Sequence, residues 1–262
     1  CIFLFANGIP AMKEIGFGEF LSGEMWKPKN EIFGILPMIV GSLYVTAGAI
    51  IFGVPIGILT AVFMAYYCPK KIYKPLEAAT ELLAGIPSVV YGFFGLVVIV
   101  PLIRTLGRDL GFGGNGSSIL TASLLLGMMI LPTIIGLTES SIRAVPEQYY
   151  EGAVALGATH ERAIFRVVIP AAKSGVIAAI VLGIGRAIGE TMAVIMVAGN
   201  QARLPQGIFR GVRTLTANIV IEMGYATGLH REALIATGVV LFVFILIINF
   251  SVALLKRRTT HE

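Results

Sequence analysis

The chain has 262 residues, of which 56% are hydrophobic and only 13% are charged, and its mean hydropathy is +0.86. A soluble domain of this composition would expose far too much apolar surface, so the composition indicates a membrane protein. The net charge of +5 does not indicate nucleic-acid binding, because the sequence has no basic stripe with interleaved aromatic residues. Two cysteines far apart, Cys1 and Cys68, offer no disulfide framework, and three scattered histidines indicate no metal site.

The N-terminal residues predict the end of a membrane helix. The chain begins with Cys1 rather than methionine, and the apolar residues Ile2–Phe5 follow directly. A lipid-modified cysteine is normally followed by a polar tether, so we interpret Cys1–Phe5 as the outer end of a first membrane helix whose beginning is absent. We expect residues 1–32 to hold this helix end and an extracytoplasmic segment, and residues 33–262 to form the transmembrane domain.

Five further segments are long and apolar enough to cross a membrane, for which about 20 apolar residues are needed. The predicted spans are Pro37–Tyr67, Leu82–Ile103, Ile119–Leu137, Gly175–Gly199 and Leu234–Leu255. In the first span, Gly53 and Gly57 flank Pro55, so we expect a kinked helix with a small face that packs closely on a neighbour. The predicted fold class is all-α, a polytopic bundle of transmembrane helices.

Positive charges at the helix ends indicate the orientation. Three lysines at 70–74 follow the first full span, and Lys256–Arg258 follow the last. Alternating spans place both clusters on one side. The total number of Lys and Arg residues barely favours either side, but their density at the helix ends favours this side as cytoplasmic. We therefore expect a cytoplasmic C-terminus.

The polar connection Thr138–Ser174 is too long for a tight turn and predicts two short helices. Pro146 suits the start of the first helix, and Gly157 suits its end. Thr159 suits the cap of a second helix that runs toward Pro170. Such a small-residue helix end suits a groove on a partner protein; the alternative is an amphipathic helix at the level of the lipid headgroups.

The fourth predicted span contains one arginine, Arg186, and a glutamate four residues later, Glu190. An arginine inside a span costs about 2.5–3.5 kcal/mol on insertion scales, so it is rarely present without a task. In one continuous helix, Arg186 and Glu190 would share a face, beside the small pair Gly185 and Gly189. We weigh two interpretations: a polar lining for an anion path, and a structural salt bridge between helices.

The loop resembles the EAA loop of ABC importer permeases, whose pattern is E-A-A, three residues, G, nine residues, I, one residue, L-P. Four positions keep this spacing: Glu151, Ala153, Gly157 and Pro170. Three positions differ by small-for-small or apolar-for-apolar changes: Gly152, Val167 and Ile169. The resemblance implies a loop that couples the permease to an ATPase through Glu151, Ala153, Ala155, Leu156, Gly157 and Ala158.

Two further segments resemble the phosphate-specific branch of this family, and its PstC-type permeases in particular. They are ELLAGIPSVVYG at 81–92 and RAIGETMA at 186–193. The core of the second segment also resembles sulfate and molybdate permeases, and the combination with the first segment favours phosphate. The resemblance extends from about Phe33 to the end of the chain.

The resemblance implies a type I ABC importer of several subunits in the cytoplasmic (inner) membrane of a prokaryote. It implies a second permease of the PstA type, an ATPase dimer of the PstB type that holds ATP and Mg²⁺, and an extracytoplasmic phosphate-binding protein of the PstS type, with membrane lipid around them and no nucleic acid. The chain lacks G-x-x-x-x-G-K followed by S or T, so we expect no ATPase site and no bound cofactor in this chain. Alternatives are a permease for sulfate, molybdate or tungstate and, in another class, a membrane channel.

Phosphate is strongly hydrated and carries one to two negative charges at neutral pH, so a path for it needs a group that replaces water. A guanidinium does this with two parallel hydrogen bonds, and we expect Arg186 to be that group. Glu190 would either neutralise Arg186 or, when protonated, donate a hydrogen bond to the anion. The predicted pathway residues are Arg186, Gly189, Glu190 and Thr191.

Overall fold

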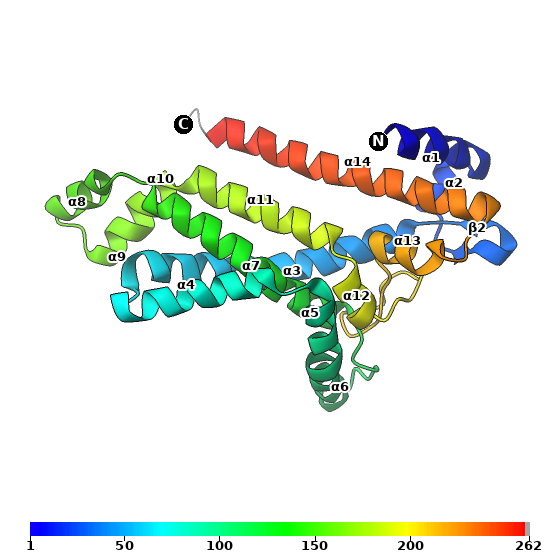
Figure 1. The fold of residues 1–262 in the computed structure, drawn as a ribbon, viewed down its shortest axis with the longest axis horizontal. Coiled ribbons are helices and arrows are strands. Elements are labelled where there is room, and N and C mark those ends of the chain that lie inside the picture. Colours follow the sequence, from blue (N-terminus) through cyan, green and yellow to red (C-terminus); the bar gives the residue numbers. More distant parts are fainter. Residues whose placement is uncertain (260–262) are drawn as a thin grey trace.

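The computed structural model describes residues 1–259 and the side chains of residues 1–250. The molecule is an elongated helical bundle (Figure 1). Four long helices run along it: α3 (Leu36–Val62), α7 (Ile119–Arg143), α11 (Lys173–Gly189) and α14 (Gly228–Thr259). The all-α prediction agrees with this architecture, because the described part of the chain has only one short hairpin of strands.

Helix α7 forms the centre of the bundle. In its most apolar window 67% of the residues are buried, against 33% in α3 and 28% in α14. Helix α3 packs closely on α7, because a Cβ at Gly53 would lie 2.8 Å from the Gly127 carbonyl oxygen and one at Gly57 would lie 2.7 Å from Ile134. The small face predicted for the first span is therefore confirmed as its packing face. The other helices expose large apolar side chains on their outer sides, as expected of helices that face lipid.

The predicted spans agree with the structure in part. Four helices are long and apolar enough to cross a membrane, or up to five if the bent pair His160–Ala171 and Lys173–Gly189 is one span. The spans predicted from Pro37, Ile119 and Leu234 correspond to Leu36–Tyr67, Ile119–Arg143 and Gly228–Phe250. Pro55 in the first of these helices and Pro132 in the second lie inside the helix without ending it.

The second predicted span is wrong at its start. Residues Leu82–Gly85 belong to α4 (Lys70–Gly85), and the chain is extended at Ile86 and Pro87. Pro87 disfavours the helical conformation of the residue before it, Ile86, so α4 ends at Gly85 and a new helix begins at Ser88. This helix runs through α5 (Ser88–Phe94), a π-helical turn (Gly95–Ile99) and α6 (Val100–Asp109), and it projects sideways from the bundle (Figure 1).

The N-terminal region is more ordered than the sequence predicts. The first helix, α1 (Ile2–Ile15), extends well past Phe5 into a region expected to be a polar connection. Gly8 allows the close approach of α1 to α14, because a Cβ there would lie 2.6 Å from Val239. A short helix, α2 (Phe17–Ser22), a 3-10 turn (Pro28–Asn30) and an antiparallel hairpin of β1 (Trp26–Lys27) and β2 (Ile32–Phe33) complete this region.

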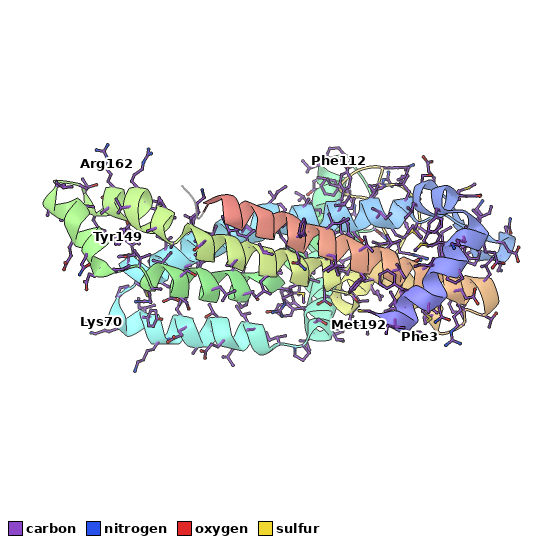
Figure 2. All side chains as sticks on the ribbon, turned by 90° about the horizontal axis from the view of Figure 1, so that it is seen from above. Phe3, Lys70, Phe112, Tyr149, Arg162 and Met192 are labelled. Carbon is purple, nitrogen blue, oxygen red and sulfur yellow. The ribbon has the colours of Figure 1, made fainter. Side chains whose placement is uncertain are left out.

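The prediction of two short helices between Thr138 and Ser174 is confirmed. Helix α8 (Glu147–Ala155) follows Pro146, and α9 (His160–Ala163) continues through a π-helical turn (Ile164–Val168) into α10 (Ile169–Ala171). The Thr159 hydroxyl accepts a hydrogen bond from the Arg162 N–H and caps α9. Figure 2 shows Lys70, Tyr149 and Arg162 at the same end of the molecule.

Candidate functional site

Arg186 and Glu190 do not share a helical face, and the prediction that they do is wrong. Helix α11 ends at Gly189, and Glu190 is extended, with φ −68° and ψ 134°. The fourth predicted span, Gly175–Gly199, is therefore two helices, α11 and the short α12 (Met192–Val197). Among the described residues, no ion pair joins Arg186 to Glu190. The interpretation of a simple salt bridge between these two residues loses its basis.

The Glu190 side chain instead caps the helix that follows it. Its Oε1 accepts hydrogen bonds from the N–H groups of Thr191, at 3.0 Å, and Ala193, at 3.2 Å. A carboxylate is favourable at this position, because the first N–H groups of a helix have no partners within the helix. The Thr216 hydroxyl, from α13 (Leu215–Met223), donates to the Glu190 carbonyl oxygen at 3.1 Å. These contacts fix the break between α11 and α12.

Arg186 is half-buried and weakly held. Its Nη1 donates to Thr133 Oγ1, on α7, at 3.4 Å, which is at the long end of the hydrogen-bond range. A Cβ added at Gly185 or Gly189 would meet no atom within 4 Å, so there is open space beside the backbone on both sides of Arg186. Thr133 lies 53 residues from Arg186, and nothing in the sequence connects the two residues.

The structure brings together the two segments that most resemble phosphate permeases. Helix α5 packs on α12 at Gly92, where a Cβ would lie 2.7 Å from the Met196 sulfur and 3.0 Å from the Ala193 Cα. The Tyr91 hydroxyl donates to the Leu83 carbonyl oxygen at 2.8 Å and so ties α5 back to α4 across the Pro87 break. The break before α5 and the break before α12 therefore lie in one packed unit.

The tip of the predicted EAA loop is an exposed apolar point. Leu156 is 91% exposed, and Gly157 directly after it has φ +85°. This left-handed conformation ends α8 at the position predicted for a glycine. The Tyr150 hydroxyl lies 2.7 Å from His160 Nδ1, and this contact joins α8 to α9. The Tyr150 ring also lies 5.8 Å from that of Tyr66, at the end of the first span, so the loop is anchored to the bundle.

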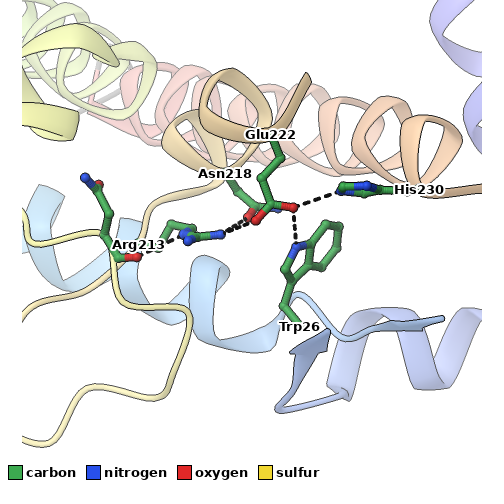
Figure 3. A network of polar contacts seen from close by, with 6 residues as sticks. Trp26, Arg213, Asn218, Glu222 and His230 are labelled. Atoms are coloured by element: carbon green, nitrogen blue, oxygen red, sulfur yellow. Dashed lines mark hydrogen bonds and ion pairs between the residues drawn. The ribbon is translucent and has the colours of Figure 1, made fainter. Parts of the chain in front are cut away.

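A buried polar network lies at the opposite end of the molecule (Figure 3). Arg213 Nη1 donates to Glu222 Oε1 at 2.6 Å and to Asn218 Oδ1 at 3.0 Å. Glu222 Oε2 accepts from Trp26 Nε1 at 2.8 Å and lies 2.8 Å from His230 Nε2. The network joins the N-terminal hairpin to α13 and α14. Sequence reasoning missed it, because its members are spread from Trp26 to His230 in separate polar segments.

The chain is similar to known transport proteins. Residues 53–261 match the family of binding-protein-dependent transport system inner membrane components. The phosphate transport system permease protein PstC of Mesorhizobium japonicum is 38% identical, over 94% of this chain and 80% of that protein. The probable ABC transporter permease protein YqgH of Bacillus subtilis is 39% identical, over 95% and 82%. A probable PstC protein of Methanocaldococcus jannaschii is 32% identical, over 99% and 88%.

Solved structures share the fold. A chain of the inward-facing MetNI methionine ABC transporter matches with a TM-score of 0.68 at 20% identity, over 90% of this chain and 99% of that one. A chain of a bacterial alginate ABC transporter, solved with its periplasmic protein bound to an alginate pentasaccharide, matches with a TM-score of 0.64 at 17% identity, over 99% and 91%. At these identities the likeness concerns the arrangement of the helices.

Proposed function

This chain belongs to the family of binding-protein-dependent transport system inner membrane components, and from that premise we propose that it is the permease subunit of an ATP-driven importer of inorganic phosphate. The relatives named as phosphate permeases support the substrate, because they cover most of this chain at 32–38% identity. Arg186 is the observation that carries the proposal. It is a half-buried arginine in a membrane bundle, with one long hydrogen bond and open surface beside it.

Arg186 would hold the anion with its guanidinium. The planar fork gives two parallel hydrogen bonds to phosphate oxygens and replaces part of the hydration shell. Thr133 holds the guanidinium by a single long contact, so most of the five N–H donors stay available to an anion. A path must also release its substrate, and a contact surface open on one side favours weak binding and fast release.

Glu190 would act through the backbone beside the path. Because its Oε1 caps α12, the carboxylate holds the N–H groups of Thr191 and Ala193 just after the end of α11, the helix that carries Arg186. Its negative charge near the guanidinium also limits how tightly an anion is held. The Thr191 hydroxyl, which donates to the Gly189 carbonyl oxygen at 3.2 Å, would turn to donate to the anion, and Gly189 would leave space for the anion at this break.

The exposed loop would transmit ATP-driven motion. Leu156 would be the apolar contact for a groove on the ATPase, and Ala153, Ala155 and Ala158 would provide the small surroundings that let it insert. Glu151 would be the charged residue of the same contact surface. The Tyr150–His160 contact and the Tyr66 ring make the loop and the end of the first span move together. Closure of an ATPase dimer would then rock the bundle as a rigid body.

The proposed complex contains this chain, a second permease, an ATPase dimer and an extracytoplasmic phosphate-binding protein. ATP and Mg²⁺ would bind to the ATPase subunits, and this chain would hydrolyse nothing itself. The chain would lie in the cytoplasmic membrane with the loop and the C-terminus on the cytoplasmic side. The lysines at 70–74 lie at the same end as the loop, which supports this orientation (Figure 2).

Uptake by the reconstituted importer tests the substrate. Proteoliposomes that contain the whole complex are given radiolabelled phosphate together with ATP, and sulfate or molybdate is added in excess. We expect ATP-dependent phosphate uptake that neither competitor reduces. Uptake that sulfate or molybdate abolishes would assign the permease to that oxyanion, and uptake without ATP would indicate a channel.

Substitution at the loop tip tests the coupling. Gly157→Val forces a β-branched residue into a left-handed conformation, a strain of about 1–2 kcal/mol, while its Cβ meets no atom within 4 Å. We expect ATP hydrolysis without phosphate uptake, or failure to bind the ATPase. Gly136→Val is the matched control, since its Cβ also meets no atom within 4 Å but its backbone is helical and lies outside the loop. Phosphate-stimulated uptake at the normal rate in Gly157→Val would contradict the coupling role.

Cysteine labelling tests the orientation. In a variant that lacks Cys1 and Cys68, a cysteine at Ala158 should react with a membrane-impermeant thiol reagent only from the cytoplasmic face. Labelling from outside intact cells would invert the topology and remove the loop from the ATPase.

A further inference from the structure

A basic cavity lies at the end of the molecule that carries the coupling loop. It has a volume of about 570 Å³ and lies between the end of the first span, the start of α4 and the end of α7. Its lining residues are Met64, Ala65, Cys68, Lys70, Tyr73, Lys74 and Arg143. Three of them are cationic and none is acidic, so the cavity attracts anions.

Arg143 is the fixed cation of this cavity. Its Nε donates to Glu139 Oε1 at 2.8 Å, its Nη2 donates to the Met64 carbonyl oxygen at 3.1 Å, and its guanidinium carbon lies 4.9 Å from the centre of the Tyr73 ring. These contacts join α7, the end of the first span and α4. The Glu139 carboxylate neutralises most of the Arg143 charge. The excess positive charge of the cavity therefore comes from the lysines.

Lys70 and Lys74 stand one turn apart on α4 and face the same cavity. Both are exposed, and neither forms an ion pair among the residues that the structure describes. Two exposed, flexible ammonium groups give a general attraction for phosphate-bearing groups rather than a fixed cage for a small ion. Such a site suits a ligand that gains affinity from a second, apolar part.

The position of the cavity at the membrane surface indicates where the apolar part of such a ligand would bind. Two membrane spans, Leu36–Tyr67 and Ile119–Arg143, end at it, so it lies at the level where lipid headgroups meet the bundle. Phe63 and Ile72, next to lining residues in the sequence, are 43% and 52% exposed and offer apolar surface to acyl chains. Basic pockets between membrane helices on the cytoplasmic side bind anionic lipid headgroups.

We propose that this cavity binds the headgroup of an anionic phospholipid, with Lys70 and Lys74 as the contacts that select a negative headgroup. A second cavity, which also contains Arg143, is lined by Tyr150 and His160 of the coupling loop. The lipid headgroup would therefore lie next to Arg143, which also borders the contact between Tyr150 and His160 in the coupling loop. The proposal does not depend on which anion the permease carries.

Lipid titration of the whole importer tests the proposal. The purified complex in a neutral detergent is titrated with a fluorescent short-chain phosphatidylglycerol and with its phosphatidylcholine counterpart. We expect saturable binding of the anionic lipid only. The double variant K70Q with K74Q should weaken it about 20-fold, from roughly fivefold for each lysine near a charged headgroup. The matched control is K71Q with K173Q, which removes two exposed lysines near this end that do not line the cavity, and it should change binding less than twofold.

Three outcomes would overturn the proposal. Equal weakening in both double variants would indicate a diffuse surface potential, and equal binding of the two lipids would remove the role of charge. Displacement of the lipid by millimolar inorganic phosphate or ATP would indicate a soluble anion as the occupant. If the variant complex does not assemble, the unmodified importer is crosslinked with a photoreactive phosphatidylglycerol instead. Crosslinks at residues 68–74 or at residue 143 would support the site. Crosslinks found only at other residues would refute it.

Discussion

Arg213 and Arg186 are both arginines of the bundle, but Arg213 is held by several hydrogen bonds and Arg186, the residue proposed to bind the anion, is held by one. The Arg213 side chain is only 15% exposed and donates to Glu222, to Asn218 and, through Nε, to the Asn200 carbonyl oxygen (Figure 3). Arg186 makes one side-chain hydrogen bond in the described part of the chain, at 3.4 Å to Thr133. The Arg213 charge is paired with a buried carboxylate and its hydrogen bonds join separate segments, which is typical of a structural residue, whereas an arginine with unused donors beside open space can bind a ligand.

The largest effect is expected when the Arg213 network is broken. Glu222→Ala strands the buried Arg213 guanidinium and removes the acceptor of Trp26 and His230. Breaking a buried ion pair from one side costs about 3–5 kcal/mol, so thermal unfolding of the purified importer should occur at a clearly lower temperature. Glu232→Ala removes an exposed carboxylate from α14 and should leave unfolding within about 0.5 kcal/mol. If Glu222→Ala and Glu232→Ala unfold at the same temperature, the structural role of the Arg213 network is contradicted.

Arg186 should behave in the opposite way. Arg186→Ala removes hydrogen bonds to a charged ligand, worth about 1.5–3 kcal/mol, so phosphate uptake should fall roughly 10- to 150-fold while the complex assembles and unfolds normally. Arg186→Lys keeps the charge but not the two-pronged contact. Its phosphate uptake should therefore lie between that of the unmodified importer and that of Arg186→Ala. Arg108→Ala, exposed at the end of α6, is the control with unchanged uptake. If Arg186→Ala assembles poorly but the complexes that do assemble take up phosphate at the normal rate, Arg186 has a structural role like that of Arg213.

Glu190 is expected to affect both stability and uptake, because its carboxylate caps α12 and also lies beside the proposed path. Glu190→Ala removes this cap and should cost about 0.5–2 kcal/mol of stability. Glu190→Gln keeps an oxygen acceptor for the Thr191 and Ala193 N–H groups but removes the charge. We therefore expect normal unfolding and altered uptake kinetics for Glu190→Gln. If Glu190→Gln unfolds as easily as Glu190→Ala, the charge rather than the acceptor holds the break.

The smallest effect is expected at Thr133, which the Arg186 guanidinium contacts by its one hydrogen bond among the described residues. Thr133→Val removes a 3.4 Å contact, so its cost is at the low end of the range for a hydrogen bond, about 0.5 kcal/mol or a two- to threefold change in the phosphate concentration for half-maximal uptake. Thr60→Val, where the hydroxyl bonds only to the Ile56 carbonyl oxygen in its own helix, should leave that concentration unchanged. Abolished uptake in Thr133→Val would show that Arg186 depends on this contact for its position.

The sequence by itself determined the features that follow from local chemistry. Apolar runs predicted the helices around α3, α7 and α14, because a span needs only length and hydrophobicity. Pro146, Gly157 and Thr159 predicted the two helices of the loop, because helix ends depend on backbone conformation and capping at single positions. The spacing of Glu151, Ala153, Gly157 and Pro170 in the same loop resembles the family that the comparisons support.

Only the tertiary structure decided how charges pair across the bundle. Arg186 and Glu190 look like an ion pair in a continuous helix, but Glu190 leaves the helix because its carboxylate finds the free N–H groups of α12. The partners of Arg186 and Arg213 come from helices and loops distant in the sequence, where no periodicity connects them. Which polar groups are satisfied inside a membrane protein depends on long-range packing, and that packing gives Arg213 a buried carboxylate partner and Arg186 only a long contact to Thr133 among the described residues.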